Sequence, residues 1–284
     1  MSAATTFVWR GTSSESGGGA LEPELRDLDS SRILAADSWL VDAGRVRALE
    51  LHRRRFLDAV SKSTAGRSSV ASEPAVDAAE LAPEAFWDAA IAALPRTGTW
   101  FPRVELVDAG PSDAPDPQMR LLLRPAPDRG RSVTVATHSG PDPRRSPRIK
   151  GPDIVALSHL RDAAKKRRVD ELVILTPEGR IAEGTTTCFA WWNGDVLVTP
   201  SPEIERIDSV TLRSLQAVAI ALGTAVETDG ARPDDLEGHE VWALNALHGI
   251  RIVTAWLGGP VVAEEPGRLA RWQARLDGLR APLP

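Results

Sequence analysis

The fold is decided by the stretch KGPDIVALSHLRDAAKKRRVDELVILTPEGRIAEGTTTCFAWWNGDVLVTP, residues 150–200. Gly151 and Pro152 disfavour a helix that runs through Lys150, so we expect a helix to begin just after the lysine. Short apolar runs then alternate with turn residues, and an Asn-Gly pair near the end is typical of a tight hairpin. The pattern predicts one helix followed by two pairs of short strands, which indicates a mixed α/β domain.

Outside that stretch, the periodicity of apolar residues predicts further elements. The helix after Lys150 is expected to have Asp153 at its cap and to bury Ile154, Leu157, Leu160 and Ala164. Elsewhere we expect a hairpin over 33–51, a short helix from 52, a loop over 62–76, helices near 83–94, 209–222 and 266–279, and strands near 101–107, 119–124, 133–137, 224–228 and 240–244. Because strands and helices do not alternate strictly, neither a Rossmann sheet nor an eight-fold barrel is expected.

Composition narrows the class of protein. The net charge of −5 argues against a nucleic-acid or anionic-membrane partner. There is no apolar run long enough to span a membrane and no signal-peptide pattern at the start. The single cysteine, Cys188, cannot form an internal disulfide. Together these features predict a cytoplasmic globular protein, and the Pro/Gly/Arg-rich segment 125–132 is the expected domain junction.

Lysine is rare in this chain. Lys and Arg total 34, but the lysines are only Lys62, Lys150, Lys165 and Lys166. A guanidinium stays protonated and cannot form a Schiff base, so an isolated lysine is a candidate for amine chemistry. Arginines close to Lys150 favour its neutral, nucleophilic form. The alternative is that Lys150 belongs to a solvated, arginine-rich loop, and composition alone leaves both readings open.

The order of motifs resolves this ambiguity, because it resembles the class IV, fold-type IV family of pyridoxal-phosphate (PLP) enzymes. That family places its Schiff-base lysine before a helix, followed by an acidic apolar strand, a glycine turn, a V-x-E-G segment, an aromatic strand and Thr-Pro. Here Lys150 precedes the helix, Glu171–Leu175 is the acidic strand and Ile181–Gly184 is the V-x-E-G segment. Lys150 and Glu183 lie 33 residues apart, as expected for the family.

The resemblance implies the fold and the cofactor. The fold class would be α/β (α+β), a two-domain fold-type IV enzyme similar to D-amino-acid aminotransferase. A small N-terminal domain would span 1–127 and a large C-terminal domain 128–284, with PLP in the cleft between them, usually in a homodimer. Lys150 would carry the cofactor, and Glu183 would pair with its pyridine nitrogen, so that the ring can accept electrons from the substrate.

The same resemblance assigns further cofactor ligands. The family's G-I-T-R turn binds phosphate at a helix start, which corresponds here to Val210 and Thr211. The arginine of the family's H-x-x-R-L motif corresponds to Arg55. Asn245, in Asn-Ala-Leu, occupies a turn where aminotransferases often carry Thr-Ala, and is expected to reach the phosphate.

Substrate residues are expected among the arginines, since an arginine fork suits a carboxylate. Arg124 ends the strand MRLLLR, where family members often bind a carboxylate, and Arg144 lies on the loop before Lys150. The sequence departs from the family at Cys188, where Asn is usual, and it contains no tyrosine. The five histidines show no metal-ligand spacing, so no metal is expected.

Three functions therefore stay open. The first is transamination between an amino acid and a 2-oxo acid. The second is the aminodeoxychorismate lyase reaction, which forms 4-aminobenzoate and pyruvate, and which Asn245 and the residues after it favour. The third is a non-catalytic binding protein of the same fold, which the departures from the family suggest. The amino donor, the acceptor and the stereochemistry at Cα are not encoded in any recognisable motif.

Overall fold

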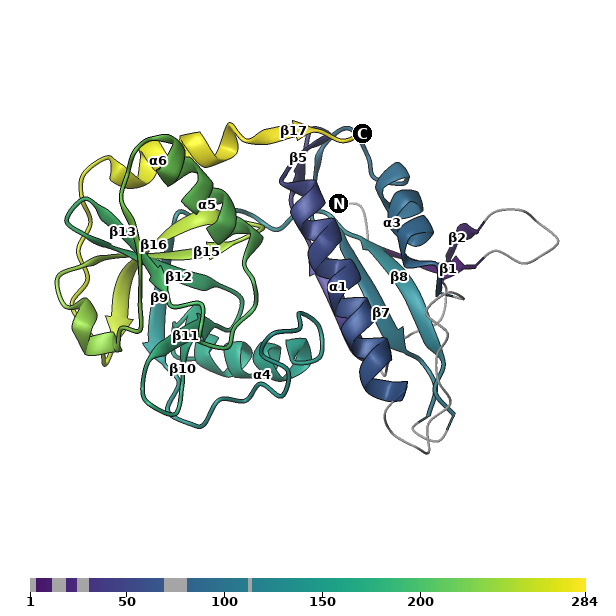
Figure 1. The fold of residues 1–284 in the computed structure, drawn as a ribbon, viewed down its shortest axis with the longest axis horizontal. Helices are drawn as coiled ribbons and strands as arrows, with labels where there is room; N and C mark the ends of the chain where they lie inside the picture. The colour runs from purple at the N-terminus through teal and green to yellow at the C-terminus, as the bar shows by residue number, and fades with distance from the viewer. Residues whose placement is uncertain (1–3, 12–18, 25–30, 69–80, 112–113) are drawn as a thin grey trace. The chain divides into compact units, whose positions relative to one another are not determined.

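The computed structural model describes residues 4–11, 19–24, 31–68, 81–111 and 114–284. The chain forms two compact units (Figure 1). Unit 1 comprises Met1–Pro127, Ile149–Pro152 and Arg280–Pro284, and unit 2 comprises Asp128–Arg148 and Asp153–Leu279. No helix in the described part of the chain has the length and apolarity needed to cross a bilayer.

The described residues of unit 1 form two antiparallel sheets and the helices α1 and α3. Its larger sheet has the order β2-β1-β8-β7-β3, formed by β2 (Ala20–Pro23), β1 (Thr5–Arg10), β8 (Pro117–Leu123), β7 (Arg103–Asp108) and β3 (Arg32–Ser38). The smaller sheet has the order β17-β5-β4-β6, formed by β17 (Arg280–Pro282), β5 (Arg45–Arg47), β4 (Val41–Asp42) and β6 (Thr99–Trp100). The helices are α1 (Leu49–Ser68) and α3 (Pro83–Ala92).

The helix α1 is longer than the sequence pattern predicts. A loop was expected from residue 62, but the helix continues to Ser68, and residues 69–76 of that expected loop lie outside the described part of the chain. Tertiary contacts explain the difference, since Phe56 and Val60 pack into the core of unit 1 and Ser63 donates a hydrogen bond to the Leu34 carbonyl on β3. Packing therefore overrides the weak helix propensity of the Ser/Ala/Gly-rich segment.

Unit 2 is built on a mixed sheet of eight strands. Its order is β11-β10-β9-β16-β15-β12-β13-β14, formed by β11 (Ile181–Gly184), β10 (Glu171–Leu175), β9 (Ser132–Thr137), β16 (Gly249–Leu257), β15 (Glu240–Asn245), β12 (Cys188–Asn193), β13 (Val196–Pro200) and β14 (Val226–Asp229). The helices are α4 (Ile154–Lys165), α5 (Val210–Ala221), α6 (Arg268–Asp277) and the 3₁₀ turn η1 (Pro233–Leu236).

The sheet of unit 2 is buried on both faces at β12. Ala190 and Trp192 pack in the apolar cluster that includes α5 and α6, whereas Phe189 and Trp191 pack in a second cluster with β9 and β16. Alternate residues of a strand point to opposite faces, so a strand covered on both sides has a continuous apolar sequence. This explains the run CFAWW, and the predicted Asn-Gly hairpin is present between β12 and β13.

The helix α4 differs from its predicted packing. Only Ala164 of its expected apolar face is buried, and Leu160 packs at the edge of a small cluster with Leu172. Asp153 makes no side-chain cap bond; its carboxylate instead accepts hydrogen bonds from the backbone amides of Arg145 and Ser146. The C-terminal half of the helix therefore contacts the sheet, while the carboxylate at its start orders the loop upstream.

The segment 149–152 belongs to unit 1, although the predicted boundary assigned it to the C-terminal domain. The Ala36 amide on β3 donates a 2.7 Å hydrogen bond to the Lys150 carbonyl, and Ile149 packs against the core of unit 1. The last residues of the chain also join unit 1, because β17 pairs with β5. Both segments join unit 1 through backbone pairing that no local sequence pattern reveals.

Candidate functional site

Lys150 is positioned by the edge strand β3. Besides the bond from the Ala36 amide, the following residue brings the backbones together: a Cβ on Gly151 would lie 2.7 Å from the Ala35 Cα, and Gly151 has a φ of +140°. Only glycine tolerates both conditions, so Gly151 is required for this approach. The Lys150 side chain is half-buried and has interaction partners in this conformation.

The next residue of β3, Asp37, binds the predicted phosphate ligand Arg55. The Arg55 guanidinium donates two 2.7 Å hydrogen bonds to the two oxygens of the Asp37 carboxylate, in a bidentate pair. The same carboxylate accepts from the Ser38 amide and lies 2.9 Å from the His52 Nδ1. Thus Ala36 and Asp37, adjacent on one strand, hold Lys150 and Arg55 respectively.

In the Asp37 cluster, Asp37 and His52 are buried, the Arg55 side chain is 15% exposed, and the three groups interact electrostatically. Burial by itself opposes ionisation of Asp37, but the charges of Arg55 and His52 hold its pKa well below the usual range. Burial lowers the pKa of His52, against the opposing charge of Asp37. The cluster therefore contains an ionised Asp37 and a guanidinium whose orientation is fixed by a rigid two-point contact.

Glu183 lies on β11 and is buried in unit 2. One carboxylate oxygen accepts a 2.5 Å hydrogen bond from Arg144, and the other accepts from the Ile207 amide at 3.2 Å. Arg144 also binds both oxygens of Asp142 and donates to the Glu205 carbonyl. The side chain of Arg144 is only 3% exposed, and its described contacts are with two carboxylates and one backbone carbonyl of the protein itself.

The electrostatics of this group favour charged forms. Burial alone would lower the pKa of Arg144, but the hydrogen bonds that Arg144 donates to Asp142 and the charge of Glu183 raise it. Burial opposes ionisation of Asp142, but hydrogen bonds and charge from Arg144 lower its pKa below the usual value. Arg144 binds one oxygen of Glu183 and the Ile207 amide binds the other, so the carboxylate is held at both oxygens.

The loop that Glu183 anchors leads directly to the predicted phosphate turn. Two residues after Ile207, Ser209 caps α5 by accepting a 3.2 Å hydrogen bond from the Leu212 amide. Val210 and Thr211, in the first turn of α5, are both buried. The first amides of a helix have no intrahelical partner and favour an anion. In unit 2, a hydrogen bond therefore links the predicted ring-binding carboxylate to the loop that leads into the predicted phosphate-binding turn.

Asn245 ends β15 and shapes the turn into β16. Its side-chain oxygen accepts a 2.8 Å hydrogen bond from the His248 amide, which closes the turn. The His248 Nδ1 in turn accepts from the Gly130 amide at 3.1 Å. Burial, followed by the charge of Arg251, lowers the pKa of His248 to about 4, so this imidazole is neutral at pH 7. The contacts of Asn245 are therefore those of a residue that orders a turn.

Two residues singled out from the sequence remain: Arg124 lies in unit 1, and Cys188 lies in unit 2. Arg124 donates a 2.8 Å hydrogen bond to the Phe101 carbonyl and stacks over the Phe101 ring at 5.0 Å. Burial, followed by the charge of Arg103, lowers the pKa of Arg124 to about 10. Burial raises the pKa of Cys188 to about 12, so the thiol is protonated at pH 7. Among the described residues, no group of His, Cys, Asp and Glu is arranged to hold a metal ion.

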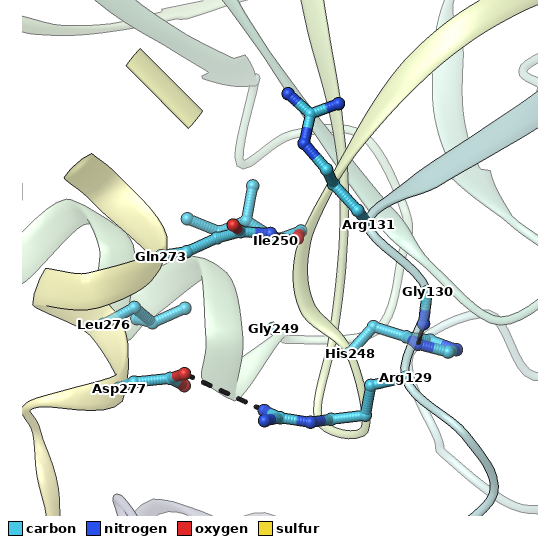
Figure 2. Close-up of a pocket in the computed structure, with 9 residues that line it drawn as sticks. All are labelled: Arg129, Gly130, Arg131, His248, Gly249, Ile250, Gln273, Leu276 and Asp277. Carbon is cyan, nitrogen blue, oxygen red and sulfur yellow. Dashed lines mark hydrogen bonds and ion pairs between the residues drawn. The ribbon is translucent and has the colours of Figure 1, made fainter. Parts of the chain in front are cut away.

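A surface cavity of about 200 Å³ lies elsewhere in unit 2 (Figure 2). It is bordered by the segment Arg129–Arg131, the turn at His248 and the face of α6 that carries Gln273. Its arginines are both paired: Arg129 binds Asp277, which also lines the cavity, at 3.8 Å, and Arg131 binds Glu264, which does not line it. None of the predicted cofactor or substrate residues lines this cavity. It adjoins the Asn245 turn through His248 and Gly249.

Sequence reasoning missed the acidic residues that orient the predicted ones. Asp37, Asp142 and Glu171 bind Arg55, Arg144 and the loop after Glu183, respectively. Asp37 and Glu171 carry a usable signal, because each is a carboxylate at or within an apolar strand, ILAADSW and ELVIL. A buried carboxylate requires a partner, so its presence in such a strand predicts an ion pair. Its partner is distant in sequence and has no comparable signal.

Comparisons with known proteins identify the family and the fold of this chain. The family model described as amino-transferase class IV matches residues 34–256. A search of curated protein sequences finds no significant match. Among solved structures, a hypothetical aminotransferase from Mycobacterium tuberculosis in its PLP-bound form is 16% identical, with a TM-score of 0.72 and coverage of 98% of both chains.

Two further structures represent different activities. The branched-chain amino acid aminotransferase of Thermobaculum terrenum is 17% identical, with a TM-score of 0.74 and coverage of 98% of both chains. A candidate 4-amino-4-deoxychorismate lyase from Legionella pneumophila is 13% identical, with a TM-score of 0.68 and coverage of 86% of this chain and 90% of that chain. Because the family model spans most of the sequence and the fold matches over its whole length, the chain belongs to the class IV aminotransferase family and has the fold-type IV, mixed α/β architecture.

Proposed function

We propose that this protein is a PLP-dependent transaminase that exchanges an amino group between an amino acid and a 2-oxo acid. The observation that carries the proposal is the fixation of Glu183, a buried carboxylate held by Arg144 and by the Ile207 amide, two residues before the cap of α5. A pyridine nitrogen and a phosphate are the two polar ends of the cofactor. Glu183 and the α5 N-terminus supply a matching acceptor and a matching set of donors.

The residues present fit this cofactor on structural grounds. Within the described residues, the buried Thr187 hydroxyl has no hydrogen-bond partner, and it belongs to the loop that follows Glu183. A Cβ on Gly184 would lie 2.4 Å from that hydroxyl, so the loop excludes a side chain there. A buried hydroxyl without a partner is costly and suggests that a ligand supplies one. We assign Lys150, Arg55, Glu183, Val210, Thr211 and Asn245 as the cofactor ligands.

Each residue has a defined task in this proposal. When bound, the cofactor supplies an electron-accepting ring that stabilises the negative charge left when a substrate Cα loses its proton. The Lys150 amine removes that proton. Arg55, oriented by Asp37, and the first turn of α5 bind the phosphate. Glu183 would accept a hydrogen bond from the ring nitrogen, and its ion pair with Arg144 would hold the carboxylate in place.

We assign the substrate carboxylate to Arg124, whose guanidinium is partly exposed and tethered through its Nε. That tether leaves the two terminal nitrogens as donors for a carboxylate. Arg144 stays a predicted substrate residue, but its contacts with Asp142 and Glu183 support a role in holding the carboxylate of Glu183. The amino donor and acceptor follow from neither contact set.

The decisive test replaces the lysine. Lys150→Ala is expected to abolish the visible absorption band that PLP gives when bound to the wild-type protein, together with amino transfer from an amino acid to a 2-oxo acid. Lys62→Ala, an exposed lysine of α1, is the matched control and should retain both. If the wild-type protein stayed colourless after addition of PLP, the non-catalytic reading would replace the transaminase.

The lyase is a second candidate, supported by the Asn245 turn. Its Asn-Ala-Leu sequence resembles the lyase branch, and the bond from the His248 amide to the Asn245 side chain orders that turn. Purified protein supplied with aminodeoxychorismate would release pyruvate without an added 2-oxo acid if it were a lyase. Amino transfer that depends strictly on a 2-oxo acid, with no pyruvate release, would support the transaminase. We also expect the protein to be a cytoplasmic homodimer. Light scattering, which measures molar mass in solution, would test the dimer.

A further inference from the structure

The carboxylate of Glu171, at the first position of β10, is completely buried and bound by four donors. It lies outside the set of predicted ligands. Its donors are the Thr185 hydroxyl at 2.6 Å, the Thr186 amide at 3.0 Å, the Thr186 hydroxyl, and the Arg251 guanidinium at 3.2 Å. Since a carboxylate has about four acceptor positions, its capacity is filled. Glu171 therefore acts through these groups and has no free oxygen position for a ligand.

Arg251 balances the negative charge of the buried Glu171 carboxylate. It lies on β16, is 5% exposed, and forms an ion pair with Glu171. An unpaired charge in the interior is strongly destabilising, whereas a paired and hydrogen-bonded one is sustained. Arg251 thus provides the positive charge, and the loop hydroxyls and amide provide the remaining donors. The pair is a fixed point in the sheet to which the loop 184–187 is attached.

The attached loop begins directly after Glu183. In addition to the contacts with Glu171, the Thr185 amide donates to the Leu172 carbonyl at 3.1 Å, and the Gly184 amide donates to the Thr187 carbonyl at 2.7 Å. Every residue from Gly184 to Thr186 is therefore bonded to the sheet or within the loop. The Glu183 backbone is fixed from its C-terminal side, while Arg144 and Ile207 fix its carboxylate.

We propose that Glu171 and Arg251 are positioning residues, which hold the loop 184–187 so that the Glu183 carboxylate meets the cofactor ring. This role rests on the proposed function. The same sheet contains a natural comparison, because Glu240 at the start of β15 is also a buried carboxylate that binds an arginine, Arg268. Its other donors, Trp242 and the Glu265 amide, are remote in sequence from the Glu183 loop.

The test removes the loop contacts and leaves the ion pair intact. The double variant Thr185→Val/Thr186→Val loses both hydroxyl donors to Glu171, while Arg251 still balances the charge of Glu171. Two readouts are measured: deuterium uptake by the backbone amides of residues 183–188 in the cofactor-free protein, and the dissociation constant of PLP. The double variant is expected to exchange faster and to bind PLP about tenfold more weakly, the order expected when hydrogen bonds to a charged group are lost.

Thr199→Val is the matched control, since Thr199 is a buried β13 threonine whose hydroxyl bonds to the Glu227 carbonyl. It should leave both readouts unchanged. A second comparison removes charge with Glu171→Gln and Glu240→Gln. Both variants are expected to unfold at a lower temperature, but only Glu171→Gln should weaken PLP binding and shift the visible band of the bound cofactor. If Glu171→Gln does not fold, the threonine variants still decide the proposal.

The outcomes are distinguishable. Weaker PLP binding together with faster exchange in the Thr185/Thr186 variant, and in neither control, would support the positioning role. Unchanged PLP affinity in that variant, or an equal loss in Thr199→Val, would overturn the positioning role and leave the transaminase proposal standing. A wild-type protein that binds no PLP would overturn the proposed function and the positioning role with it.

Discussion

Two buried carboxylates of this protein each bind an arginine, Asp37 in unit 1 and Glu183 in unit 2, but the partners have opposite tasks. Asp37 holds Arg55 by a bidentate contact and has His52 as a further neighbour. Glu183 is itself held, by Arg144 and a backbone amide, and Arg144 is shared with Asp142. In unit 1 the carboxylate orients the arginine, and in unit 2 the arginine orients the carboxylate.

The comparison explains why one kind of ion pair serves two purposes. An arginine that must bind an anion needs its guanidinium fixed in a plane, which a bidentate carboxylate provides. A carboxylate that must stay ionised beside a ring nitrogen needs a nearby positive charge that does not occupy both its oxygens. The Asp37 side chain is fully buried. The Asp142 side chain is 26% exposed and forms a second ion pair with Arg144, beside the pair between Arg144 and Glu183.

The largest effect is expected from breaking the unit 1 pair. Asp37→Asn removes the buried carboxylate that binds Arg55 and His52 and should lower the free energy of unfolding by about 3–5 kcal/mol, the usual cost of removing one partner of a buried pair. Urea denaturation measures this change. Asp42→Asn is the control, because its pair with Arg280 is partly exposed and should cost less than about 1 kcal/mol. Equal losses in the two variants would contradict the assigned difference.

Breaking the unit 2 carboxylate should affect catalysis more than stability. Glu183→Gln preserves shape but removes the negative charge, and Arg144 keeps Asp142 as its partner. We expect amino transfer to slow by about a hundredfold or more, the scale typical for loss of a group that stabilises charge in the transition state. Steady-state kinetics with PLP in excess measure the rate. A Glu183→Gln enzyme with an unchanged kcat would exclude contact with the ring nitrogen.

Replacing the arginine of unit 2 sharpens the comparison. Arg144→Lys keeps the charge but cannot span Asp142 and Glu183 at once, because lysine lacks the planar fork. We expect kcat to fall by about tenfold, equivalent to one charged hydrogen bond, with little change in the KM for the amino acid. Arg148→Lys on the same loop, whose partner Glu205 is exposed, should have no measurable effect. A large rise in KM would instead support Arg144 as a substrate ligand.

The smallest effect concerns pH. The pKa of Asp37 is depressed in the folded state, so its contribution to stability is present above its unfolded pKa, about 3.9, and is lost as the pH falls toward the folded value. The free energy of unfolding of the wild-type protein should therefore drop as the pH is lowered from about 5 to 3. The drop should be shallower in Asp37→Asn. Asp142→Asn, at a partly exposed site, should reduce the drop in the free energy of unfolding less than Asp37→Asn does. Parallel plots of unfolding free energy against pH for the wild type and Asp37→Asn would contradict the link between Asp37 ionisation and stability.

Local patterns predicted much of the secondary structure and the family. The hairpin between β12 and β13, the helix α5 and the strand β10 follow from turn residues and apolar periodicity. The length of α1 and the packing of α4 do not follow from local patterns, because both depend on contacts with distant strands. Periodicity reports which residues of an element are apolar, but it does not report how much of that face another element covers.

The sequence by itself determined the family, the fold and the candidate ligands, since these depend on residue types in a fixed order along the chain. Only the tertiary structure decided which carboxylate faces which arginine. Asp37 and Arg55 are 18 residues apart, Arg144 and Glu183 are 39 apart, and Glu171 and Arg251 are 80 apart. Ion pairs act over a few ångströms in space, and the separation of two residues along the chain does not encode that distance.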